Sequence, residues 1–312
     1  MMATNPGMSA GQVRNNADAS GPSSLDLGGD IRVRSRPSSL RLLLSRKASA
    51  IGLTLYALVI FVAIFAPLIS PYNPLKIAPA VILQGPTSAH WLGTDELGRD
   101  VLTRIIYGAR VSIAVSVIAV AIALVCGIVL GMISGYRGGA VSSVIMRSMD
   151  ALAAFPAVLL ALAILSALGP GIRNAMIAIG VVYVPAFARV MRGSVLSVKR
   201  NEYVEAARAS GASTIYIMRK SVFPNCVSPL LVHASIGFAN AIIVEAALSF
   251  LGLGTQPPTA SWGAMLDNGR QFVDQNAWYS ISAGLAIFVT VLGLNLLGDG
   301  LRDVLDPRLR TS

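Results

Sequence analysis

Six long apolar stretches alternate with shorter polar segments along the chain. They lie near residues 48–69, 111–133, 150–168, 175–192, 229–251 and 281–299. A bilayer core of about 30 Å needs roughly 20 helical residues, so each stretch is long enough to cross it. The third and fourth are the least regular: Arg147 and Asp150 stand at the start of one, and Pro185 and Arg189 interrupt the other. The pattern predicts an all-α integral membrane protein with six transmembrane helices.

Composition and charge support this class and exclude others. Of the 312 residues, 54% are hydrophobic and 13% are charged, which is unlike a soluble domain. The net charge of +10 could suggest a nucleic-acid partner, but apolar runs separate the basic residues and no basic patch with interleaved aromatic residues is present. If both termini are cytoplasmic, 19 of the 25 Lys and Arg residues lie in the tails and inner loops, as the positive-inside rule expects.

The loop between the fourth and fifth stretches contains a helix-bend-helix pattern, residues 201–222, which we call the knob. Small alanines alternate with charged residues from Asn201 to Ser210, which favours a short helix. Gly211 permits a sharp change of direction. A second short helix, Thr214–Val222, is expected to end before Pro224. Seven basic residues lie between Arg189 and Lys220, so we expect the knob to face the cytoplasm.

At these positions the chain resembles permease subunits of ABC importers. The residues that carry the resemblance are Glu205, Ala206, Ala207, Gly211 and Pro224. Ser221 and Phe223 depart from the residues usual in the family but conserve the spacing. The resemblance implies that these five residues couple the chain to an ATP-hydrolysing subunit, whose closure the knob transmits to the membrane spans.

Two outer segments narrow the resemblance. They are the run from His90 to Asp100 and the run from Ser249 to Gly254, followed by Gln256-Pro257-Pro258 and Ser261-Trp262-Gly263. These resemble the second permease of dipeptide and oligopeptide importers, a branch that includes nickel and glutathione systems. The resemblance implies the type I ABC importer permease fold in the bacterial cytoplasmic membrane, with both termini cytoplasmic. It also implies four kinds of partner: a homologous permease in a heterodimer, two ATP-binding subunits, an extracytoplasmic substrate-binding protein and membrane lipid, with no nucleic acid.

We divide the chain accordingly. The divisions are a disordered cytoplasmic tail (1–40), an anchor span (41–75), an extracytoplasmic loop (76–110), a permease core (111–300) and a cytoplasmic tail (301–312). The core contains a cytoplasmic coupling loop (193–228) and an extracytoplasmic cap (252–280), which we call the outer cap. The outer cap either faces the binding protein or only packs over the ends of the spans.

Polar residues inside apolar spans are candidates for function, because an unpaired charge in hydrocarbon is costly. Glu245 and Asn240 are candidates for the translocation path, and Trp262 for the outer cap. For Glu245, pairing with Arg270 or with a loop amide is an equal alternative. His233 is expected to be a hydrogen-bonded helix contact rather than a metal ligand.

Small residues recur every fourth position along the second span. They are Ala119, Ala123, Gly127, Gly131 and Gly135. One face of this helix is therefore nearly smooth, and another helix can pack closely against it. We interpret the stripe as structural.

Several absences bound the chemistry. The chain has no Gly-Lys pair and therefore no phosphate-binding Gly-Lys-Ser/Thr loop. ATP and magnesium are thus expected on a partner, with no cofactor in this chain, which is not an enzyme by itself. Cys126 and Cys226 lack the clustered partners of a metal site, and no disulfide is expected.

The motifs leave alternatives open. The cargo could be a peptide, a nickel chelate or glutathione, because these systems share the same loop motifs. A stand-alone secondary transporter would be expected to show paired inverted repeats, or broken spans with charged residues at the midplane. Neither feature is clear in this sequence. A membrane enzyme or a scaffold that only recruits a soluble partner is the remaining class.

Overall fold

The computed structural model describes residues 46–305, which form one unit of helices. The expected tail 1–40 and most of the tail 301–312 lie outside the described residues. The helices, in chain order, are α2 (Lys47–Ile69), α3 (Val101–Arg137), α4 (Gly139–Ala153), α5 (Ala157–Leu168), α6 (Ile172–Val198), α7 (Glu202–Ala209), α8 (Thr214–Tyr216), α9 (Phe223–Phe250), α10 (Trp262–Arg270) and α11 (Ala277–Leu305). A 3₁₀ turn, η1 (Pro79–Val81), lies in the first outer loop, and a π-helical turn, η2 (Ile217–Val222), joins α8 to α9.

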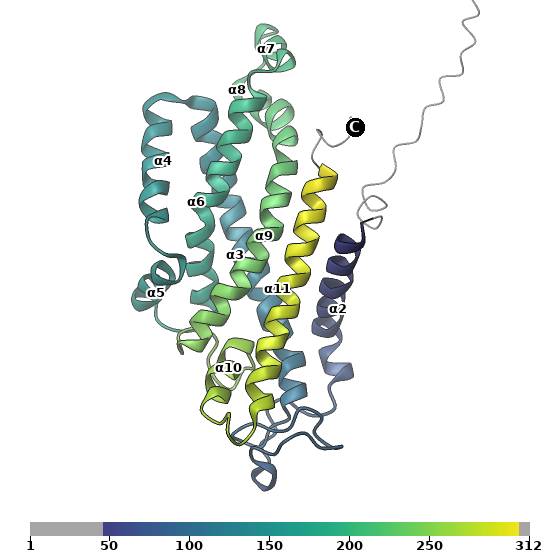
Figure 1. Cartoon of the computed structure of the whole chain (residues 1–312). Coiled ribbons are helices and arrows are strands. Elements are labelled where there is room, and N and C mark those ends of the chain that lie inside the picture. The colour runs from purple at the N-terminus through teal and green to yellow at the C-terminus, as the bar shows by residue number, and fades with distance from the viewer. Residues whose placement is uncertain (1–45, 306–312) are drawn as a thin grey trace, which may run out of the picture. The chain divides into compact units, whose positions relative to one another are not determined.

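Five helical segments of the described chain are long and apolar enough to cross a membrane. They are α2, α3, α6, the continuous run from α8 to α9, and α11. The sixth expected span, 150–168, is not a single straight helix, because α4 and α5 meet there at an angle of 94° (Figure 1). The reason is Pro156, which lacks an N–H donor and disfavours helical backbone at Phe155. Counted as one broken span, the α4–α5 pair makes six.

The second span begins ten residues earlier than the apolar pattern predicts. α3 starts at Val101 instead of residue 111 and runs for 37 residues. Asp100 caps its first turn by accepting a hydrogen bond from the backbone N–H of Thr103 at 2.8 Å. The polar start of α3 is helical because the folded outer loop surrounds it.

The stripe of small residues on α3 packs against α6. All five stripe residues are buried. A Cβ atom added to Gly127 would lie 2.4 Å from Cβ of Phe187, and one added to Gly131 would lie 2.5 Å from the carbonyl oxygen of Ala188. Neither contact leaves room for a side chain, so the two helices approach as closely as glycine allows. This contact forms the centre of the core, as the stripe predicts.

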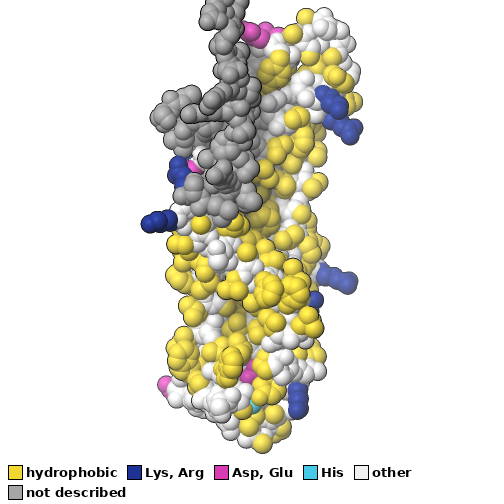
Figure 2. Space-filling model, turned by 90° about the vertical axis from the view of Figure 1, so that its right-hand side faces the viewer, with side chains coloured by type: hydrophobic (Ala, Val, Ile, Leu, Met, Phe, Trp, Pro, Cys, Tyr) yellow, Lys and Arg dark blue, Asp and Glu magenta, His cyan; other side chains and the backbone are white. Residues whose placement is uncertain are grey.

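α2 and α11 pack together on another side of the bundle. Their outer faces carry exposed large apolar side chains, including Leu58, Phe61, Ile64, Leu285 and Phe288. Figure 2 views the molecule from this side, where hydrophobic side chains cover most of the surface. Such a face suits contact with lipid acyl chains.

Candidate functional site

The first half of the knob, from its first helix to the bend at Gly211, has the structure that the sequence predicts. α7 is a two-turn helix that ends in a Schellman motif: the N–H of Gly211 donates to the carbonyl of Arg208 at 3.0 Å, and the N–H of Ala212 donates to that of Ala207 at 3.1 Å. Gly211 has φ of +78°, the left-handed conformation that this motif requires. The chain reverses there, and α7 lies at the end of the bundle opposite α10 (Figure 1).

The second half of the knob differs from the expectation. The helix beginning at Thr214 does not end before Pro224 but continues through η2 into α9, as one helical segment from Thr214 to Phe250. Pro224 lies in the first turn of α9, where its missing N–H and its fixed φ are tolerated. The wider π-helical turn just before it accommodates the change in hydrogen bonding. The second half of the knob is therefore continuous with the fifth span.

The signature residues are mostly exposed. Glu205, Ala206 and Gly211 are exposed, and Ala207 is half-buried. Beside them lie three large apolar side chains that the sequence analysis did not single out: Tyr203, Ile215 and Tyr216, which are 45%, 78% and 56% exposed. In the sequence, the signal that could have identified them is that they are large apolar residues in a loop that is otherwise basic and polar. An exposed apolar patch outside the spans marks a surface for another protein.

At the other end of α9, Glu245 is enclosed by hydroxyl groups. Its side chain is 1% exposed. Oε1 accepts hydrogen bonds from Ser249 Oγ at 2.7 Å and from Ser261 Oγ at 3.1 Å. Ser112 of α3 and Thr255 of the outer cap also lie beside the carboxyl group. This hydroxyl cage joins α3, α9 and the outer cap.

The alternative that Glu245 pairs with Arg270 is wrong. Arg270 Nε donates to Asp267 at 2.8 Å, and its guanidinium lies 4.9 Å from the centre of the Phe250 ring. In this conformation Glu245 contacts protein on all sides rather than an open path. A role for it in the path stays a prediction.

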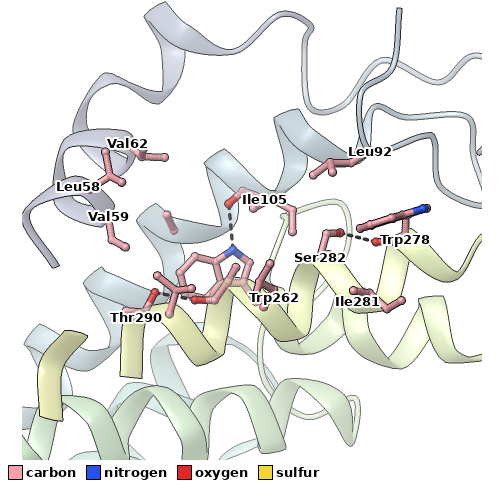
Figure 3. Close-up of a pocket in the computed structure, with 14 residues that line it drawn as sticks. Leu58, Val59, Val62, Leu92, Ile105, Trp262, Trp278, Ile281, Ser282 and Thr290 are labelled. Carbon is pink, nitrogen blue, oxygen red and sulfur yellow. Dashed lines mark hydrogen bonds between the residues drawn. The ribbon is translucent and has the colours of Figure 1, made fainter. Parts of the chain in front are cut away.

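Trp262 fastens the outer cap to α3. Its indole is 2% exposed, and Nε1 donates to the carbonyl of Ile105 at 2.9 Å (Figure 3). A Cβ on Gly108 would lie 2.7 Å from the indole, so the ring rests directly on the α3 backbone. Beside it is an apolar pocket of about 310 Å³, lined by α2, α3, α10 and α11. Trp262 therefore holds elements together here, and a contact between the outer cap and a binding protein stays a prediction.

The first outer loop is organised by Asp95, which is fully buried. Its Oδ2 accepts from Arg99 Nε at 2.6 Å and lies 3.3 Å from Arg104 Nε. Its Oδ1 accepts the backbone N–H groups of Leu97 and Arg99. Asn276, at the start of the last span, donates to the carbonyl oxygens of Gln84 and Thr94. The loop is thus a folded structure bound to the rest of the bundle.

The remaining polar candidates lie apart from one another. Asn240 is exposed on α9. His233 packs edge-on against Phe187, with ring centres 4.9 Å apart. Within residues 46–305, no three His, Cys, Asp or Glu side chains come together as a metal site would require.

Comparisons with known proteins agree with this architecture. Residues 127–311 match the family model "Binding-protein-dependent transport system inner membrane component", and residues 38–86 match "N-terminal TM domain of oligopeptide transport permease C". A dipeptide transport system permease protein of Escherichia coli K12 is 47% identical over 271 residues, covering 85% of this chain and 90% of that protein. One from Alkalihalophilus pseudofirmus is 44% identical over 265 residues, covering 85% and 87%.

Solved structures show the same fold at low sequence identity. A chain of the MetNI methionine ABC transporter, in an inward-facing conformation, superposes with a TM-score of 0.54 at 19% identity. The match covers 64% of this chain and 96% of the transporter chain.

Proposed function

Because the chain belongs to the family of binding-protein-dependent transport system inner membrane components, we propose that it is the membrane-spanning permease subunit of an ATP-driven peptide importer. Relatives that are 44% and 47% identical over most of the chain are named dipeptide permeases, which supports a dipeptide or oligopeptide as the cargo. The chain is a multi-pass protein of the bacterial cytoplasmic membrane. It forms half of the path, and ATP hydrolysis takes place on partner subunits.

The observation that carries this proposal is the exposed knob. Glu205, Ala206, Ala207, Gly211 and Pro224 form its signature, and Ile215 and Tyr216 add apolar area that no described residue covers. Buried aromatic and aliphatic anchors dominate the energy of protein interfaces. The knob therefore suits insertion into a cleft of an ATP-binding subunit.

The proposed orientation places the knob and both ends of the described chain on the cytoplasmic side. Arg46, before α2, forms an ion pair with Asp303 near the end of α11. Figure 1 shows both helix ends at the end of the bundle that carries α7. The coupling loop (193–228) fits the same side, because it contains five basic residues: Lys199, Arg200, Arg208, Arg219 and Lys220. The outer loop and the outer cap then face the substrate-binding protein.

The proposed assembly contains a homologous permease, two ATP-binding subunits and the binding protein. Closure of the ATP-binding subunits moves the two knobs and switches the path between inward and outward access. Because the knob continues into α9 without a break, its displacement reaches the interior of the bundle.

Co-purification of the tagged chain in mild detergent tests the assembly. Ile215→Glu places a charge on the knob without removing an internal contact, because Ile215 is 78% exposed. We expect this variant to lose most of the ATP-binding subunit that the wild type recovers, and Gly211→Asp to do the same by distorting the bend. Trp91→Glu makes the same change at the other end of the molecule, where Trp91 is 71% exposed, and should leave recovery unchanged.

Uptake of a labelled dipeptide into proteoliposomes that contain the whole complex then tests transport. ATP-dependent uptake that Ile215→Glu abolishes would support the proposal. Recovery of the chain without a sister permease or an ATP-binding subunit would refute it.

A further inference from the structure

An exposed ion pair lies on the face formed by α4 and α6. Arg189 Nη2 lies 3.2 Å from Asp150 Oδ1, and the two side chains remain 48% and 66% exposed. Arg147, three residues before Asp150 on the same helix, is also exposed. Both helices belong to segments that are apolar enough to cross a membrane. This cluster of three charges therefore needs an explanation.

The depth of the pair makes the exposure unusual. Arg189 lies ten residues before Lys199, which caps the end of α6. At about 1.5 Å per residue this is about 15 Å, half of a hydrocarbon core of about 30 Å. Asp150 lies eleven residues after Gly139, where α4 begins at the same end of the bundle. With 27 residues, α6 is about 40 Å long and therefore extends beyond a core of about 30 Å. The pair thus lies in the inner half of the membrane.

Charges at that depth do not face lipid, because acyl chains solvate them poorly. They face the interior of a bundle or a water-filled cavity. Around Arg189 on α6, Ala186, Gly193 and Ser197 are small or polar and are half-buried or exposed. Exposed apolar side chains, Val141 and Val144 of α4, lie on the same face of the bundle.

The elbow between α4 and α5 is a second, independent observation. Residues 154–156, between the end of α4 and the start of α5, are not helical and follow Asp150 closely in the chain. All three are exposed, Phe155 at 60%. Non-helical backbone at membrane depth is tolerated where protein buries it or where it lines a water-filled cavity. The described chain does not bury it. Water, cargo or a partner must contact this elbow.

We propose that Asp150 and Arg189 face the translocation path and bind the two charged ends of a peptide in transit, Asp150 its ammonium group and Arg189, with Arg147, its carboxylate. This inference rests on the proposed function and names a ligand contact within it. A free peptide has complementary charges, and guanidinium groups bind carboxylates through paired hydrogen bonds. An exposed ion pair is weak, so a peptide can separate it at little cost.

Photo-crosslinking in the intact transporter tests the contact. A dipeptide with free termini and a diazirine side chain is delivered by the binding protein, and the complex is trapped in mid-cycle with vanadate. We expect adducts on the elbow near Phe155 and on the exposed face of α6. Asp150→Asn and Arg189→Gln should each lower adduct yield and uptake about tenfold, the size of effect expected for loss of one charged contact in a path.

The ion pair between Arg46 and Asp303 provides matched controls. It joins the same residue types at the ends of α2 and α11, and its side chains are 52% and 36% exposed, so Arg46→Gln and Asp303→Asn should leave the adducts unchanged. Adducts confined to other surfaces, or yields that the Asp150 and Arg189 variants do not lower, would overturn the proposal.

Co-purification separates this inference from the proposed function. If the Asp150 and Arg189 variants lose the sister permease, the pair belongs to an interface between permeases and the inference is overturned, while the importer assignment stands. If the wild-type complex itself does not assemble or transport, the proposed function fails first.

Discussion

Replacing Asp95 by Asn removes a charge from the outer loop while leaving its shape nearly unchanged. The amide oxygen of Asn can still accept the backbone N–H groups that now bind Oδ1. Its NH₂ group, however, would face two guanidinium donors, those of Arg99 and Arg104. Both arginine side chains are about 95% buried, so their charges cannot turn to water without opening the loop. Breaking a buried pair by removing one partner costs about 3–5 kcal/mol.

Tryptic cleavage after Arg99 measures the opening of the loop. The peptide bond between Arg99 and Asp100 is protected in the folded loop, because both residues are buried. Lys76 is exposed, so cleavage after it gives an internal reference rate in the same sample. When reclosing is fast, the cleavage rate follows the opening equilibrium. A loss of about 3–5 kcal/mol should therefore raise cleavage after Arg99 roughly 10²- to 4 × 10³-fold relative to cleavage after Lys76, since about 1.4 kcal/mol is a factor of ten.

Asp267→Asn is the control for this prediction. Its ion pair with Arg270 is partly exposed, and such pairs contribute up to about 1 kcal/mol, or roughly fivefold. If Asp95→Asn raises cleavage after Arg99 no more than Asp267→Asn does, the buried pair does not hold the loop, and the reasoning is refuted.

Three further predictions test other contacts. Gly131→Ala should abolish the monodisperse complex in gel filtration, because its Cβ would lie 2.5 Å from a backbone oxygen of α6, whereas Gly193→Ala, with no atom within 4 Å, should be tolerated. Trp262→Phe loses one hydrogen bond worth about 1 kcal/mol and should lower the apparent Tm by a few degrees; an unchanged Tm would contradict the anchoring role. Glu245→Leu should lower the Tm more than Glu245→Gln, because leucine leaves buried serine hydroxyls without an acceptor; equal shifts would contradict this.

Much of the helical fold is predictable from local pattern. The apolar stretches locate five spans, because each is long and apolar. The stripe of small residues identifies the face of α3 that packs on α6. The bend at Gly211 follows from the need for positive φ after a helix end. These features depend on residues that are close together in the sequence.

Features that depend on distant residues were harder to predict. The early start of α3 depends on Asp95, whose charge allows Arg99 and Arg104 to be buried beside it. The continuation of the helix through Pro224 depends on the π-helical turn before it. The sequence pattern does not reveal that change in backbone hydrogen bonding. By contrast, the break at Pro156 is a local feature, because this proline lies within the apolar run 150–168 and lacks the N–H that a continuous helix needs.

The candidate site shows the same division. The cage around Glu245 combines Ser249, one turn away on the same helix, with Ser261, sixteen residues further along the chain. The first contact follows from helical spacing. The second depends on how the outer cap folds back. The basic loop around Ile215 and Tyr216 is a local signal, but their exposure depends on the fold, in which the bundle does not cover them.

The unbroken helix from Thr214 to Phe250 sets how motion can be distributed in the molecule. Its 37 residues span about 55 Å, at about 1.5 Å per residue. A rod of that length that tilts by about 10° around one end moves its other end by roughly 10 Å. The rod can bend at the π-helical turn and at Pro229, both near its inner end, and the chain turns where the rod stops, at Gly211 and at the Leu251–Gly254 turn. The point about which the helix tilts therefore sets how far its outer end moves for a given displacement of the knob.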